Sequence, residues 1–216
     1  GKPMGSYITL EADQLSRKDE DYHREVSEEL ARQIGRLLEG KNYRSSSYHV
    51  LAVGLGNSSV TPDSLGPRVL HNLQVTRHLK VQYGDEFWSG RSMPVISGIV
   101  PGVMAQTGME SAEILKGIIH ETKPDLIIAI DALAARSVKR LGTTIQLTDT
   151  GIHPGSGVGN HRHSLTEESL GVPVMAIGVP TVVGAAAIVH DTVSAMIGAL
   201  SKSMETKGMG DFVGSM

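Results

Sequence analysis

The sequence contains no cysteine among its 216 residues. This absence excludes a disulfide framework, a thiol nucleophile and a thiolate zinc site, and it suits a reducing compartment. Aromatic residues make up only 4% of the chain, so any core must be built mainly from aliphatic side chains. No apolar run is long enough to span a bilayer and the N-terminus has no signal-peptide pattern, so we expect no membrane association.

The chain also lacks a long basic run, and its formal net charge is −3. A surface that binds nucleic acid directly is therefore not indicated. What the chain does have is 40% hydrophobic residues and 25 glycines, which is enough for one domain with an aliphatic core and loops of specific shape.

Continuously apolar runs alternate with segments of helical spacing. We expect strands at residues 7–10, 48–54, 93–100, 125–131, 143–149 and 172–180. We expect helices at about 19–39, after residue 64, within 101–122, and at 184–202. This alternation indicates a single α/β domain over residues 1–216, with a mostly parallel central sheet and helices on both faces. In such folds the functional crevice lies at the carboxyl ends of the strands.

The first candidate for chemistry is Asp63, in the stretch TPDSLGP. Thr61 is suited to cap a helix, with Pro62 in its first position and Asp63 just inside. In one interpretation Asp63 only complements the helix dipole. In the other, the preceding loop Gly54–Asn57 places it in the crevice, where backbone N–H groups favour the carboxylate anion.

The second candidate is Asp131, which follows the apolar run LIIAI. The pattern predicts that Asp131 ends the strand at residue 131, where desolvation favours a protonated carboxyl group. A purely structural role, with Arg136 or backbone donors as partners, remains open. Two carboxyl groups in one crevice, one charged and one protonated, form an acid/base pair that suits hydrolysis.

His153, in GIHPGSG, lies on a predicted crevice loop and gives an alternative. Together with Asp63 and Asp131 it would form a set suited to a divalent metal in a metal-dependent hydrolase. No HExxH spacing supports such a site. The remaining histidines on predicted elements are expected at the surface or on helices: His23, His49, His71, His78, His120 and His190.

A binding function remains open as well, because two glycine-rich motifs could hold a nucleotide or a phosphate group. GLGN at residues 54–57 is an incomplete dinucleotide fingerprint, and GSGVGN at 155–160 has the composition of a phosphate cradle without the Lys-Ser/Thr of a P-loop. The chain would then be a binding module for a small anion rather than an enzyme.

Long and unusual motifs surround both aspartates: VGLGNSSVTPDSLGPRVL, SGIVPGVMAQTGMESAEILKGII, PDLIIAIDALAARSVKRLGTTIQLTDTGIHPGSGVGNHR and LGVPVMAIGVPTVV. They resemble the germination protease family of endospore-forming bacteria, from about Tyr7 to the final helix. The resemblance implies an aspartic-type endopeptidase that is made as a zymogen and degrades small acid-soluble spore proteins during spore germination. It also implies a tetramer in the cytoplasm of the forespore or spore core, and a fold similar to hydrogenase maturation proteases.

The family's two functional aspartates fall on Asp63 and Asp131, which we therefore expect to be catalytic, with either one as the acid. Supporting roles are expected for Asn57, His153 and Arg136, and neither a cofactor nor a metal is carried over. A basic lining for an acidic cleavage motif would draw on Arg136, Arg140 and Arg162. Family members have a propeptide and continue past the position of Met216, so the resemblance implies that this chain lacks both portions.

Overall fold

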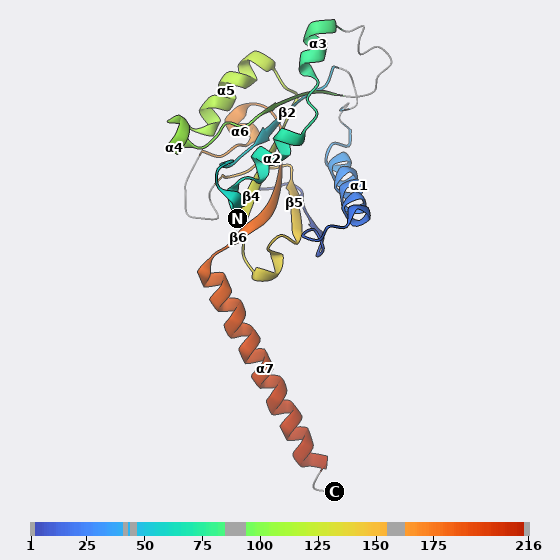
Figure 1. Cartoon of the computed structure of the whole chain (residues 1–216), viewed down its shortest axis with the longest axis vertical. Helices are drawn as coiled ribbons and strands as arrows, with labels where there is room; N and C mark the ends of the chain where they lie inside the picture. Colours follow the sequence, from blue (N-terminus) through green and yellow to red (C-terminus); the bar gives the residue numbers. More distant parts are fainter. Residues whose placement is uncertain (1–2, 41–42, 44–46, 85–93, 155–162, 214–216) are drawn as a thin grey trace.

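A six-stranded sheet forms the centre of the protein in the computed structural model, which describes residues 3–40, 43, 47–84, 94–154 and 163–213. The strand order is β1-β5-β6-β4-β2-β3 (Figure 1). The strands are β1 (Tyr7–Glu11), β2 (His49–Gly54), β3 (Val95–Ile99), β4 (Leu126–Ala135), β5 (Thr144–Thr148) and β6 (Val174–Val183). The predicted α/β class is confirmed, and each predicted strand is present with shifted ends.

Most of the sheet is parallel, as the apolar runs predicted. β6, β4, β2 and β3 pair in parallel, whereas β1 and β5 pair antiparallel to each other and β5 pairs antiparallel to β6. Only eight residues separate β4 from β5, too few for a helical crossover, so β5 returns in the opposite direction. The antiparallel strands therefore lie at one edge.

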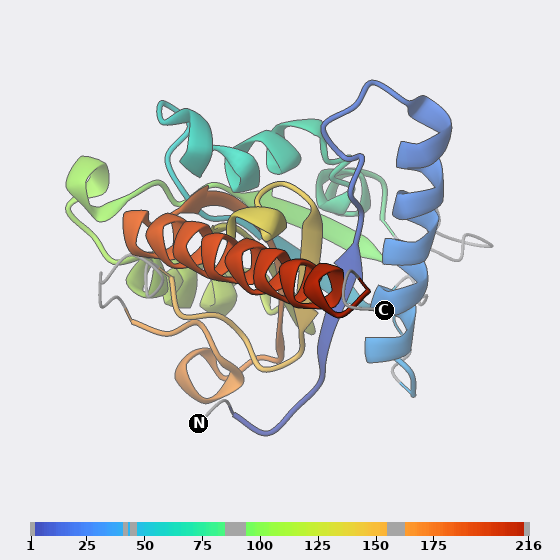
Figure 2. The same ribbon diagram turned by 90° about the horizontal axis from the view of Figure 1, so that it is seen from below.

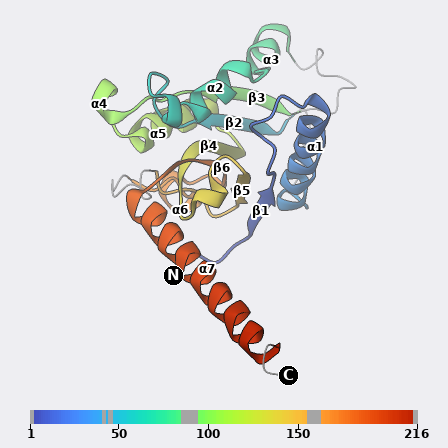
Figure 3. The same cartoon turned by 60° about the horizontal axis from the view of Figure 1, so that its bottom comes forward.

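Helices cover both faces of the sheet. On one face α5 (Ser111–Thr122) and α6 (Glu167–Leu170) pack on the inward side chains of β2 and β4. On the other face lie α1 (Glu20–Leu37) and α2 (Leu65–Asn72). Figure 3 shows α1 and α5 on opposite sides of the strands, and Figure 2 shows β1 and α1 side by side at one edge. Two short helices, α3 (Arg77–Tyr83) and α4 (Met104–Thr107), complete the connections.

Several element boundaries differ from those predicted from the sequence. β4 continues to Ala135, so the prediction that Asp131 ends its strand is wrong. Asp63 does not lie in the first turn of α2, because it belongs to a separate 3-10 turn, η1 (Thr61–Asp63), which Thr61 does not cap. The final helix, α7 (Ala185–Val213), extends well beyond the predicted residue 202.

α7 leaves the body of the domain as a long projecting helix (Figure 1). Its first turns are tied to η3 (Val138–Arg140), because the Asp191 carboxylate accepts hydrogen bonds from the Ser137 hydroxyl and the Val138 N–H, both at 2.8 Å. These two donors lower the pKa of Asp191 below its usual value. Within the described part of the chain, no helix combines the length and the apolar character needed to cross a membrane.

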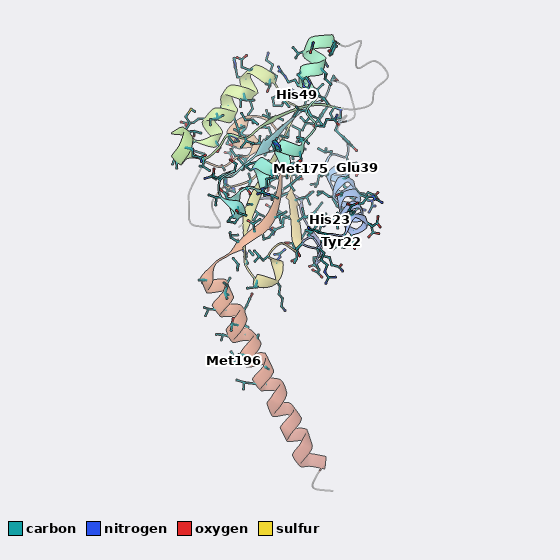
Figure 4. All side chains as sticks on the ribbon, viewed as in Figure 1. Tyr22, His23, Glu39, His49, Met175 and Met196 are labelled. Atoms are coloured by element: carbon teal, nitrogen blue, oxygen red, sulfur yellow. The ribbon has the colours of Figure 1, made fainter. Side chains whose placement is uncertain are left out.

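His49 was expected at the surface or on a helix, and this expectation is wrong. It opens β2 and is buried, with only 8% of its surface exposed. Its ring nitrogens lie 2.9 Å from the Thr122 carbonyl and 2.9 Å from the Ser97 hydroxyl, and Figure 4 shows it inside the body of the domain. Burial, acting against the hydrogen bond to Thr122, lowers the pKa of His49 below its usual value.

The lowered pKa of His49 predicts a pH-dependent stability. Between that pKa and the unfolded value of about 6.5, the unfolded chain binds more protons than the folded chain. We therefore expect the free energy of unfolding to fall as pH drops below about 6.5, by at most about 1.4 kcal/mol per pH unit for this one proton.

Urea unfolding measured from pH 7.5 to 5 checks this expectation. His49→Gln should flatten the slope between pH 6.5 and 5. His120→Gln is the matched control, because the His120 side chain is 86% exposed and its removal should leave the slope unchanged. An unchanged slope in His49→Gln would show that the acid sensitivity comes from other groups.

Candidate active site

The order of the strands creates a switch point between β2 and β4. The chain leaves β2 outward to β3, whereas it leaves β4 in the opposite direction toward β5 and β6. In open α/β sheets, functional sites form at such a point, beyond the carboxyl ends of the strands. The loop after β2 and the second half of β4 are therefore the segments to inspect, and they carry Asp63 and Asp131.

Asp131 lies where β4 loses its neighbour β2. The last pair of β2 and β4 joins Gly54 to Ile130, and from Asp131, which pairs with Gly178, onward β6 is the one neighbour of β4 among the described strands. The Asp131 residue is only 7% exposed, and its Oδ1 accepts a hydrogen bond from the Ala132 N–H at 2.8 Å. Asp131 therefore lies at the point where the β2–β4–β6 pairing ends, although β4 itself continues to Ala135.

Asp63 is held by the loop that follows β2. The Asn57 N–H lies 2.8 Å from the Asp63 Oδ2 and 3.1 Å from the Asp63 carbonyl oxygen, so one backbone donor serves both acceptors. The Asp63 N–H in turn donates to the Val60 carbonyl at 2.9 Å. These bonds close residues 57–63 into a compact turn with Asp63 partly buried.

Gly56 allows this turn to close. Its φ is +114°, and a Cβ there would lie 2.0 Å from the Asp63 carbonyl oxygen and 3.1 Å from the Asp63 Oδ1. A side chain is therefore excluded by both conformation and space. The GLGN stretch, which suggested a dinucleotide fingerprint, uses this glycine to approach the chain's own Asp63.

The Ile130 carbonyl links the two candidate aspartates. It accepts a hydrogen bond from the Leu55 N–H at 2.8 Å, and a Cβ on Gly66 would lie 2.6 Å from it. Leu55 begins the Asp63 loop, Gly66 lies in the first turn of α2, and Ile130 directly precedes Asp131. The backbone on both sides of Asp63 thus lies close to the residue that precedes Asp131, through a hydrogen bond at Leu55 and close packing at Gly66.

Asn57 holds the Asp63 turn through its backbone N–H, and its side chain makes two further contacts. Its side-chain Oδ1 accepts from the Ser59 N–H at 3.0 Å and from the Gln106 Nε2 at 3.3 Å. Gln106 belongs to α4, so this contact connects α4 to the Asp63 loop. No sequence pattern pointed to Gln106 or Gly66, whereas Gly56 was noticed as part of GLGN but assigned to a possible dinucleotide fingerprint.

The other predicted residues are less closely associated with the aspartates. His153 is exposed, and Arg136 is exposed just beyond the end of β4. At about 3.3 Å per residue along a strand, the α carbon of Arg136 is roughly 17 Å from that of Asp131, which argues against a direct pair. Arg140 lies in η3, whereas Arg162 and the GSGVGN loop lie outside the described residues.

A metal set of Asp63, Asp131 and His153 is not assembled. Within the described ranges, no three His, Asp or Glu side chains are grouped so that they could hold a metal ion. All three residues of this alternative set belong to those ranges, so the alternative metal centre lacks its geometric basis in this structure.

Fold and site together define an α/β protein with a buried carboxyl group at the switch point of its sheet and a second one on the adjoining loop. The sequence profile of the germination protease family matches residues 1–211. The chain is 54% identical over 206 residues to the germination protease of Caldanaerobacter subterraneus subsp. tengcongensis, covering 94% of this chain and 60% of that relative. It is 49% identical over 205 residues to that of Bacillus subtilis, covering 95% of this chain and 55% of that relative. This chain belongs to the germination protease family.

The chain spans only part of the length of the curated relatives that it matches. The match includes nearly all of this chain, but only between about half and three fifths of the curated relatives. The family assignment therefore applies to the α/β domain described above.

Proposed function

We propose that this chain carries the peptidase site of an aspartic-type endopeptidase that degrades small acid-soluble spore proteins during germination. Membership of the germination protease family supports a peptidase. The observation that supports the aspartic mechanism is at the Ile130 carbonyl, which directly precedes Asp131, accepts a hydrogen bond from the Leu55 N–H of the Asp63 loop and packs closely against Gly66.

In the proposed reaction, Asp63 is the base and Asp131 is the acid. Asp63 is the more accessible of the two and takes a proton from a water molecule as that water attacks the peptide carbonyl. Asp131 is buried, an environment that favours a neutral carboxyl group, and it donates its proton to the carbonyl oxygen or the leaving amine.

Cleavage of a purified small acid-soluble spore protein by the protein at its full natural length tests this proposal. We expect fragments with new amino termini, and we expect cleavage to persist in EDTA. Loss of cleavage in EDTA, with recovery on adding one divalent metal, would instead favour the metal-dependent hydrolase. Absence of cleavage by a folded protein that binds nucleotide would favour the small-anion binding module.

The proposal includes the zymogen state, the spore-core location and the tetramer implied by the family resemblance. For the tetramer, α7 offers a suitable surface, and Figure 4 shows Met196 on it, far from the body of the domain. Six large apolar residues between Ala185 and Leu200 are 44–61% exposed: Ile188, Val189, Val193, Met196, Ile197 and Leu200. Among Asp, Glu, Lys and Arg, the same segment contains only Asp191. A second copy can therefore pack on it without like-charge repulsion.

Light scattering after size exclusion tests the role of α7. Ile197→Glu should reduce the oligomer to smaller species, because it places a charge in the apolar contact. Val81→Glu is the control, since Val81 is 70% exposed on α3 and its replacement should leave the mass unchanged. A monomeric parent protein at micromolar concentration, or an unchanged mass for Ile197→Glu, would contradict this proposal.

A further inference from the structure

β6 contains a bulge beside the candidate active site. Leu133 of β4 pairs with Pro180 of β6, and the next residue, Ala134, pairs with Val182. Thr181 is therefore skipped in the pairing of the two strands. Thr181 is thus the extra residue of the bulged strand. Bulges bend a strand and redirect a side chain, and they are over-represented next to active sites.

The redirected Thr181 side chain contacts the turn that carries Asp63. Its Oγ1 donates a hydrogen bond to the Pro62 carbonyl oxygen at 2.6 Å, across 119 residues of sequence. Pro62 is in the middle of η1, directly before Asp63. This bond holds the turn from the β6 side, whereas the Asn57 N–H holds it from within the loop.

β6 also forms the surroundings of Asp131. Gly178, three residues before Thr181, pairs with Asp131. A Cβ on Gly178 would lie 2.4–3.0 Å from side-chain atoms of Leu133, so the absence of a side chain there leaves room for Leu133 beside Asp131. One short segment of β6 therefore contacts the elements of both candidate aspartates.

We infer that Thr181 is a positioning residue, whose hydroxyl fixes the Asp63 turn relative to the β4–β6 ribbon that carries Asp131. This inference rests on the proposed function, in which both aspartates act on one peptide bond. A general base must lie within hydrogen-bond reach of its water, and small displacements of catalytic groups have large effects on rate. Without the Thr181 hydroxyl, η1 loses its tie to β6 and Asp63 samples positions that are too far from Asp131.

Thr181→Val tests the inference, because it removes the hydroxyl and keeps the β-branched shape. We expect kcat for cleavage of a small acid-soluble spore protein to fall about tenfold to a hundredfold, with KM changed by less than about threefold. Thr181→Ser keeps the hydroxyl and should restore kcat to within about threefold of the parent. All rates are measured below the melting temperature of each variant and divided by the folded fraction.

Thr143→Val is the matched control. The Thr143 hydroxyl also donates to a backbone carbonyl, that of Lys139 at 2.7 Å, but in the exposed connection between β4 and β5. Its removal should leave kcat and KM unchanged. If Thr181→Val does not fold, Thr181→Ala takes its place with the same expectation.

Asp63→Asn, measured in parallel, separates failure of this inference from failure of the proposed function. If Asp63→Asn is inactive but Thr181→Val retains the parent kcat, the positioning role is overturned and the two-aspartate proposal stands. A serine variant as slow as the valine variant would also overturn it, because the hydroxyl would then not be the cause. Full activity of Asp63→Asn would overturn the proposed function and the positioning role together.

Discussion

Asp131→Asn is expected to lower kcat/KM for peptide-bond cleavage by about 10²- to 10⁴-fold while the protein stays folded. The asparagine Oδ1 can still accept the hydrogen bond from the Ala132 N–H, so the local structure is retained. What is lost is the proton that a carboxylic acid carries and an amide cannot supply. Asp63→Asn should have an effect of the same order, because the water then lacks its base.

The measurement is the cleavage rate of a small acid-soluble spore protein, with circular dichroism as the test of folding. Asp149→Asn is the control, since Asp149 also accepts a backbone N–H, that of Ser6 at 2.8 Å, but lies just beyond the end of β5. Its rate should match the parent. A folded Asp131→Asn variant with parental activity would remove Asp131 from the chemistry and leave it as a structural residue of β4.

Gly66→Ala is expected to destabilise the fold by at least about 3 kcal/mol. A Cβ at this position would lie 2.3 Å from the Leu55 carbonyl oxygen, 2.5 Å from the Leu55 nitrogen and 2.6 Å from the Ile130 carbonyl oxygen. All three are backbone atoms, and two of them form the hydrogen bond that continues the β2–β4 pairing. The strain can be relieved only when α2 moves away from the sheet, which would also displace Asp63.

Denaturant unfolding measures this effect, with Gly117→Ala as the control. Gly117 lies inside α5, and the structure places none of the described atoms within 4 Å of a Cβ built on it. Alanine is the better helix former by about 0.8–1 kcal/mol, so the control should be neutral or slightly stabilising. Equal stabilities of Gly66→Ala and the parent would mean that α2 does not pack as closely on β2 as described.

Much of the fold was predictable because burial leaves a local signature in the sequence. The short apolar run LIIAI is typical of a strand covered on both faces, and the helical spacing of residues 20–38 places Ile34, Leu37 and Leu38 on one side. Asp63 and Asp131 were candidates because each was expected beyond the carboxyl end of a buried strand, and the family resemblance pointed to the same two residues.

The sequence misjudged where Asp131 lies because strand length depends on the neighbouring strand. The small apolar residues Ala132–Ala135 read as a loop when taken alone, yet they form strand because β6 supplies hydrogen-bond partners as far as Val183. His49 was misjudged for a related reason. Its burial depends on hydrogen bonds to Thr122 and Ser97. These residues are distant in sequence, so the hydrophobic pattern around His49 could not predict the contacts.

The sequence alone determined the α/β class and the approximate strands, because hydrophobic periodicity is a property of each segment by itself, and it predicted the two candidate aspartates. The tertiary structure decided which segments meet: the Ile130 carbonyl under Gly66, the end of β2 beside Asp131, and the bulge that directs Thr181 to Pro62. These features arise from pairing between distant segments, and a one-residue shift in register would remove them without altering any local pattern.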